Sequence, residues 1–260
     1  MTSNGRPRDT SVQSVDRAVS ILQSLSRRGP SGVTEIAETL GLHKATVFRL
    51  LATLESRGLV EQDTERGRYR LGFGMVELAA GAGRQSDLSL LSRPVCRELA
   101  AAVGETVNLA IHDGLEVITV DQEIGGATIA SIDWVGKRSP LHATAAGKVF
   151  LAYMPEQQAD EVLGRGLAEY TPHTIVDPAR LKDQLRAVRE REYATTSEEH
   201  EIGLAAIAAP VRSPDGRVVA AVTVSGPTFR VNDDTVPALA EQVQDAGARI
   251  SWRQGHRKRD

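Results

Sequence analysis

The 260-residue sequence is 41% hydrophobic and 25% charged, the composition of a globular chain rather than a disordered one. No stretch approaches eighteen consecutive apolar residues, so we expect no membrane partner, and residues 1–11 read as a flexible polar arm without a signal-peptide core. The net charge is −3, but residues 1–72 hold 11 Lys and Arg against 8 Asp and Glu, which favours a nucleic-acid-binding module joined to an acidic body.

Two short helices are predicted first. Within 14–25, apolar residues recur at the spacing of one helical face behind Ser14 as N-cap, namely Val15, Ala18, Val19, Leu22 and Leu25. A second helix lies within 32–42, with Thr34 as its cap. It ends at Gly41, because glycine readily adopts the left-handed conformation that stops a helix.

A third helix and a hairpin complete an N-terminal domain over 12–72. The helix, within 43–58, buries a stripe made by Val47, Leu50, Leu51 and Leu54. The tight turn before it predicts a helix-turn-helix. Residues 59–71 alternate between polar and apolar side chains around a turn at 65–67, which predicts a β-hairpin, the wing of a winged helix-turn-helix.

Residues 73–85 are expected to form a linker helix that ends in a glycine-rich hinge, and residues 86–260 a second domain. Its expected helices lie at 88–104, 145–153, 155–163, 178–190 and 233–252, and its strands at 105–124, 127–134 and 204–226. The strand pairs turn at Asp113-Gly114 and at Pro214-Asp215-Gly216. This order predicts an antiparallel sheet flanked by helices, an α/β (α+β) fold.

The third helix presents residues that suit DNA. Opposite its buried stripe lie Ala45, Thr46, Phe48 and Arg49, with Lys44 at the helix entrance. Arginine can donate two hydrogen bonds to guanine, threonine can bond a base or a phosphate, and an apolar ring can touch the thymine methyl group. The alternative is an ordinary solvated face. Arg17 and Thr34, on the two preceding helices, complete the candidate DNA contacts of the helices.

The hairpin carries Arg66, Arg68 and Arg70, which alternate with Gly67 and Tyr69 and so leave one side of a strand. Such a row suits phosphates or a minor groove. A cationic edge strand that prevents aggregation is the alternative.

Several motifs in order carry a family resemblance over roughly residues 12–252: SVDRAVSILQSL, TEIAETLGLHKATVFRLLATLESRGLVE, RYRLG, PLHATAAGKVFLA and IGLAAIAAPVRSPDGRVVAAVTVSGP. The chain resembles the isocitrate lyase regulator (IclR) family of bacterial transcription factors. The resemblance implies a winged helix-turn-helix on operator DNA and a GAF-like domain that binds a small effector and oligomerises. It also implies a homodimer, with further pairing to a homotetramer left open.

The body motif over 140–152 leads into a helix through small residues, where backbone amides and the helix dipole favour a carboxylate. Close packing of helix on sheet is the alternative. By resemblance, the effector-binding residues are Asn108, Ala143, Thr144, Ala145, Thr196, Ala206, Thr223 and Ser225. Some acid-sensing relatives have Asp at the position of Thr196 and Cys at that of Ala206, so we hypothesise an effector of more apolar or aromatic character than glyoxylate or pyruvate.

Other site chemistry is weakly supported. The histidines have no metal-ligand spacing, no Gly-x-Ser-x-Gly motif occurs, and the run 198–201 is interpreted as a solvated charged segment. We therefore expect no catalytic residue, metal or cofactor. Cys96 is a single cysteine, which fits a reducing, cytoplasmic compartment, with nucleoid association through DNA. The resemblance implies a regulator that represses or activates nearby genes, and we expect a repressor of a catabolic operon. The alternative is a metabolite sensor or enzyme whose N-terminal module mediates protein contacts.

Overall fold

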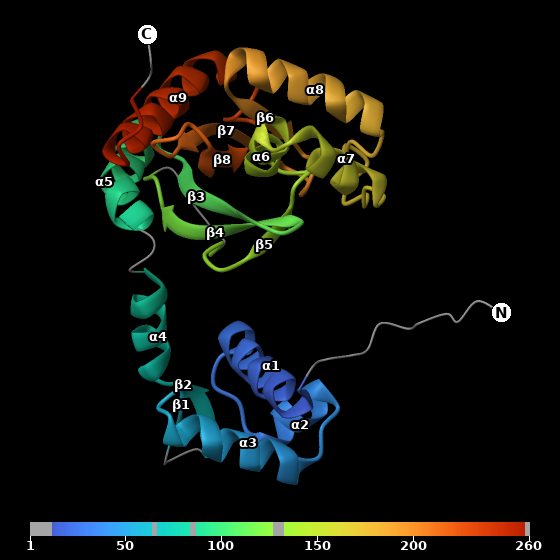
Figure 1. Cartoon of the computed structure of the whole chain (residues 1–260), viewed down its shortest axis with the longest axis vertical. Coiled ribbons are helices and arrows are strands. Elements are labelled where there is room, and N and C mark those ends of the chain that lie inside the picture. The colour runs from blue at the N-terminus through green and yellow to red at the C-terminus, as the bar shows by residue number, and fades with distance from the viewer. Residues whose placement is uncertain (1–11, 64–66, 84–86, 127–132, 258–260) are drawn as a thin grey trace, which may run out of the picture. The chain divides into compact units, whose positions relative to one another are not determined.

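The computed structural model describes residues 12–63, 67–83, 87–126 and 133–257 (Figure 1). The chain divides into two compact units, Met1–Gln85 and Ser86–Asp260. Within the described residues, no helix is both long and apolar enough to cross a membrane.

Three helices build the first unit: α1 (Gln13–Arg28), α2 (Val33–Leu40) and α3 (Lys44–Ser56). They bury one apolar cluster, to which α3 contributes Val47, Leu51 and Leu54. Gly41 has a φ of 64° and ends α2, as expected, because only a residue without a Cβ adopts this conformation without strain.

A two-stranded antiparallel sheet follows, formed by β1 (Val60–Asp63) and β2 (Arg68–Leu71). Tyr69 of β2 has a buried side chain, and its backbone exchanges two hydrogen bonds with Ser31, which ties the hairpin to the helices. The structure thus confirms a helix-turn-helix with a wing. The predicted turn lies largely outside the described residues. Helix α4 (Gly74–Gly83) then forms within the predicted linker.

The second unit, called the body below, is a curled antiparallel sheet with helices on both faces. Its strand order is β5-β4-β3-β8-β7-β6 among the described residues. The strands are β3 (Thr106–Asp113), β4 (Glu116–Glu123), β5 (Arg138–Pro140), β6 (Ala194–Ser197), β7 (Leu204–Arg212) and β8 (Val218–Pro227). The helices are α5 (Asp87–Val103), α6 (Ala145–Tyr153), α7 (Glu156–Gly164), α8 (Pro178–Arg191) and α9 (Val236–Arg253).

Successive side chains of the central strands point to opposite faces of the sheet, and each face packs into its own hydrophobic core. Val222 and Val224 of β8 pack with α5 and α9 in one cluster, whereas Ala221 faces the cluster of α6 and α8. Figure 1 shows α5 and α9 together at one side of this unit and α6 beside the strands. Thr223 and Ser225 lie on the α6 face by the same alternation, so polar residues reach a face that is otherwise filled by small apolar ones.

Several local predictions were wrong. The N-cap of α1 is Val12, not Ser14, and the N-cap of α2 is Gly32, not Thr34. The Gly32 amide donates to Glu35 Oε2 at 2.9 Å, so the carboxylate three residues on satisfies this helix end.

The predicted face of α1 is also partly wrong. Val15 and Val19 are exposed, and Ile21 is fully buried instead, because Ile21 is on the side of α1 that faces α2 and α3. In the body, the short strands β5 and β6 were missed, and the strand predicted over 127–134 lies mostly outside the described residues.

Candidate functional site

The outer face of α3 is the first candidate site. Lys44, Ala45 and Arg49 are exposed, and Phe48 keeps 57% of its surface accessible, although burying a phenylalanine is favourable. Thr46 is half-buried. In the described part of the chain, no salt bridge involves Lys44 or Arg49, so both cations are available to an anionic partner.

Helix α1 contributes to the same surface. Arg17 is half-buried and lines a groove between α1 and α3 together with Thr46 and Arg49. Thr34 is exposed on the first turn of α2 and lies outside that groove.

The wing arginines are engaged within the unit. Arg68 contacts Glu35 at 2.6 Å and Arg70 contacts Glu61 at 3.3 Å, with all four side chains substantially exposed. The Gly32 amide and then Arg68 lower the pKa of Glu35. Because exposed ion pairs are weak, a phosphate can replace either carboxylate. Arg66 lies outside the described residues.

The second candidate site is a cavity between α6 and the inner face of the body sheet. All eight residues that the resemblance indicated line it: Asn108, Ala143, Thr144, Ala145, Thr196, Ala206, Thr223 and Ser225. The other lining residues in the described part of the chain are Ala110, Val117, Thr119, Trp134, Ser139, Ala146, His200, Glu201 and Leu204. Sheet pairing brings these distant segments together, so the geometry is that of a single small-molecule cavity.

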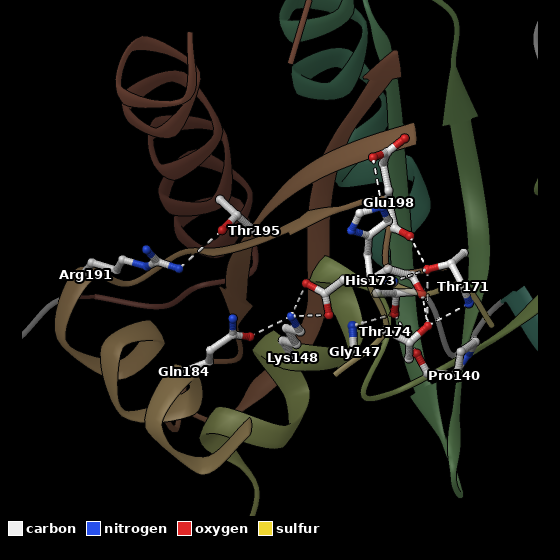
Figure 2. Close-up of polar contacts among 12 residues, drawn as sticks. Pro140, Gly147, Lys148, Thr171, His173, Thr174, Gln184, Arg191, Thr195 and Glu198 are labelled. Carbon is white, nitrogen blue, oxygen red and sulfur yellow. Dashed lines mark hydrogen bonds and ion pairs between the residues drawn. The ribbon is translucent and has the colours of Figure 1, made fainter. Parts of the chain in front are cut away.

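The N-terminus of α6 opens onto this cavity. The hydroxyl of Thr144 accepts from the Gly147 amide at 3.2 Å and donates to the Pro140 carbonyl at 2.7 Å, so it caps the helix. Figure 2 shows the contacts of Gly147 and Pro140 in place. The amides of Ala145 and Ala146 precede the first intrahelical bonds and have no acceptor among the described residues, so they are available donors at the positive end of the helix dipole.

The rings of Trp134 and His200 form another part of the wall, which sequence reasoning missed. The ring of His200 lies 6.2 Å from that of Trp134 and 5.1 Å from that of Tyr170, measured between centroids. Burial lowers the pKa of His200, an effect that Glu201 opposes, so burial favours the neutral imidazole.

A buried network anchors the segment that carries His200. Lys148 on α6 is 1% exposed, and its ammonium donates to both oxygens of Glu199 at 2.6 and 2.7 Å. It also donates to Gln184 at 2.7 Å, as Figure 2 shows. The hydroxyl of Thr174 donates to the Glu199 carbonyl at 2.6 Å.

The interpretation of 198–201 as a solvated segment was therefore wrong for Glu199, which is 7% exposed. Burial raises the pKa of Glu199 and lowers the pKa of Lys148, while their mutual attraction opposes both shifts. A carboxylate and a lysine 51 residues apart gave no local signal of this pairing.

The charges around the cavity are few. Among its described lining residues there is no Lys or Arg, and Glu201 is the one acidic side chain. The described residues contain no cluster of His, Cys, Asp and Glu suited to a metal ion.

Comparisons with known proteins agree with this two-part architecture. A family profile described as "Bacterial transcriptional regulator IclR C-terminal" matches residues 82–252, and one described as "IclR helix-turn-helix domain" matches residues 14–64. The HTH-type transcriptional regulator XynR of Escherichia coli (strain K12) is 34% identical over 247 residues, which cover 94% of this chain and 98% of XynR.

Two further relatives extend the comparison. The HTH-type transcriptional repressor AllR of the same strain is 35% identical over 242 residues, covering 92% of this chain and 89% of AllR. A crystal structure of an IclR transcriptional regulator from Alicyclobacillus acidocaldarius superposes with a TM-score of 0.82 at 31% identity, covering 94% of this chain and 100% of that one. These relatives are transcriptional regulators, not enzymes.

Proposed function

The chain belongs to the IclR family of bacterial transcriptional regulators, and from that premise we propose that it represses a catabolic operon by binding a pseudopalindromic operator as a homodimer. A two-fold symmetric protein sets two recognition helices on a site with matching symmetry. The native mass in solution distinguishes a homodimer from a homotetramer. DNA binding places the protein at the nucleoid, in the cytoplasm.

The observation that carries this proposal is the face of α3, where Lys44, Phe48 and Arg49 project outward from a buried stripe. Arg49 is assigned to a guanine edge, Thr46 to a base or phosphate, and Lys44 to a phosphate. Phe48 is assigned to a thymine methyl group or a sugar. The small side chain of Ala45 allows close approach of the helix.

Wing contacts are assigned to Arg66, Arg68 and Arg70. Arg68 and Arg70 hold Glu35 and Glu61 in the free protein, so binding exchanges these carboxylates for phosphates. When a phosphate replaces one of these carboxylates, a condensed counterion is released from DNA but an exposed ion pair is lost. The gain in DNA-binding free energy per arginine is therefore smaller than for Lys44.

The DNA proposal is tested with the full chain and the DNA upstream of its own gene. We expect Arg49→Ala to weaken specific binding by about 1–3 kcal/mol and Lys44→Ala to reduce the salt slope by about 1. Phe48→Ala should weaken binding without destabilising the fold, because the ring is largely exposed. Arg186→Ala, an exposed arginine of α8, is the control. Sequence-blind binding that Arg49→Ala leaves unchanged contradicts the assignment.

The effector is proposed to be a small organic acid that occupies the α6 cavity. Its carboxylate would accept from the free amides of Ala145 and Ala146, at the positive end of α6. Trp134 and His200 offer ring surfaces to the rest of the molecule, which supports an effector of aromatic character. Tight calorimetric binding of a two- or three-carbon acid, with none of aromatic acids, would contradict the aromatic part.

Effector binding is proposed to change the affinity of the protein for its operator. A ligand shifts the equilibrium between DNA-binding and released arrangements only by its difference in affinity for the two. The expected result is a change in operator affinity that tracks occupancy of the cavity, measured by anisotropy of labelled DNA. Full occupancy with no change in operator affinity contradicts this coupling.

A further inference from the structure

Two buried polar atoms face the α6 cavity without a partner. Among the described residues, the buried side-chain atoms that lack a hydrogen bond are Asn108 Oδ1, Thr223 Oγ1 and the Tyr153 hydroxyl. Asn108 and Thr223 are 8% and 7% exposed, stand opposite each other on β3 and β8, and both line the cavity.

The local hydrogen bonds define what these atoms require. Asn108 Nδ2 donates to Ser225 Oγ at 3.2 Å, which leaves Asn108 Oδ1 as an acceptor with no donor. Thr223 Oγ1 can donate or accept. A buried polar group without a partner costs about 1–3 kcal/mol, so such atoms in a cavity indicate a ligand group that satisfies them.

A ligand hydroxyl fits both atoms. A hydroxyl can donate to Asn108 Oδ1 while it accepts from, or donates to, Thr223 Oγ1, whereas a ligand carbonyl cannot donate to Asn108 Oδ1. With Nδ2 of Asn108 bonded to Ser225, the ligand group must donate to Oδ1, and a hydroxyl is also compatible with the flipped amide because it can accept from an NH₂ group.

The charge of the cavity sets a second limit. Free amides at the start of α6 suit one carboxylate, and no described Lys or Arg lines the wall to neutralise another. The Lys148 ammonium is held by Glu199 and Gln184, and Glu201 adds negative charge to the wall. A second carboxylate would be desolvated without a partner.

We propose that the effector is a hydroxylated monocarboxylic acid, whose hydroxyl is recognised by Asn108 and Thr223 and whose carboxylate lies at the N-terminus of α6. The assignment rests on the proposed acid effector and adds the group that selects among acids.

Calorimetry on the full chain tests the assignment with matched acids. The probes are 2-, 3- and 4-hydroxybenzoate against benzoate, 3-hydroxybutyrate against butyrate, and terephthalate as a dicarboxylate. We expect at least one hydroxy acid to bind about tenfold or more tightly than its unhydroxylated counterpart, because the counterpart leaves both protein atoms unpaired. Terephthalate should bind more weakly than benzoate.

Two variants and a control test whether Asn108 and Thr223 discriminate between hydroxylated and unhydroxylated acids. Thr223→Val and Asn108→Leu should bring the affinity ratio of the two acids towards one while the unhydroxylated acid still binds. Thr195→Val makes the same change on the opposite face of the sheet and should leave the ratio unchanged. Thermal unfolding of each variant, without ligand, checks that the body is folded.

The outcomes separate this inference from the proposed function. Equal binding of hydroxylated and unhydroxylated acids, or a ratio that survives both variants, overturns the hydroxyl assignment alone. Terephthalate binding as tightly as benzoate overturns the limit of one carboxylate. Absence of binding by every acid overturns the acid effector as well, and leaves the operator assay to decide the DNA-binding function.

Discussion

Replacing Lys148 by methionine should destabilise the body unit strongly. Lys148 and Glu199 are almost completely buried, and their atoms meet at 2.6 Å. Removing one partner leaves the other charge buried and unpaired, which typically costs about 3–5 kcal/mol. For a unit of this size, 1 kcal/mol corresponds to a melting shift of about 2–4 °C, so we expect the Tm to fall by roughly 6–20 °C.

Differential scanning calorimetry of the full chain measures this shift. Lys182→Met is the matched control, since Lys182 contacts Asp160 at the same distance of 2.6 Å but both side chains are about half exposed. An exposed pair contributes about 0–1 kcal/mol, so the control should change the Tm little. Equal shifts in Lys148→Met and Lys182→Met would refute the argument from burial.

The pH dependence of stability is a second test of the buried Lys148–Glu199 pair. In Lys148→Met, burial keeps the pKa of Glu199 above its unfolded value, so protonation stabilises the folded state at low pH and this contribution is lost as pH rises through the folded pKa. The variant should therefore be closer to wild type near about pH 5 than near about pH 8. In Glu199→Gln, burial keeps the pKa of Lys148 below its unfolded value, so stability should recover as pH rises.

A double variant completes the cycle. Lys148→Met with Glu199→Leu removes both charges, and apolar replacement of a buried pair is often neutral or stabilising. We expect the double variant to be more stable than either single one. A double variant as unstable as the worse single would show that packing around these side chains, rather than an unpaired charge, sets the loss.

Two further predictions follow from close contacts and burial. Gly147→Ala should unfold or severely destabilise the body, because a Cβ there would lie 2.2 Å from the Leu141 carbonyl oxygen. In the control Gly164→Ala, the added Cβ meets nothing within 4 Å. Circular dichroism melts compare the two variants, and equal melting temperatures contradict the prediction. Burial raises the pKa of Cys96 to about 12, so the native chain should not react with a thiol reagent near neutral pH while the unfolded chain reacts; fast labelling of the native chain contradicts this.

Local periodicity was sufficient to predict helix α3 and its exposed face. The stripe of Val47, Leu51 and Leu54 is buried as its spacing requires, and Phe48 is exposed on the opposite side. Leu50, also placed in the stripe, is only half-buried, because it lies at the edge of the contact with α1. The cap of α2 could have been found as well, since Glu35 stands three residues after Gly32.

Periodicity alone could not predict the cavity. Its walls come from strands that pair across long sequence separations, as Asn108 pairs with Thr223, and the family resemblance supplied those positions. Trp134 and His200 were missed because an isolated ring carries no periodic signal. The buried state of Glu199 was missed for a related reason: its partner Lys148 lies on a helix far away in sequence.

The contacts around α6 explain why an effector would find its cavity largely formed. Thr144 caps the helix, Gly147 packs against the backbone of Leu141, and Lys148 holds Glu199, the residue before His200 in the wall. Donors at the helix start and the rings opposite are thus positioned by bonds that involve no ligand. Little binding free energy is then spent on ordering the cavity, so more remains to favour one arrangement of the regulator over the other.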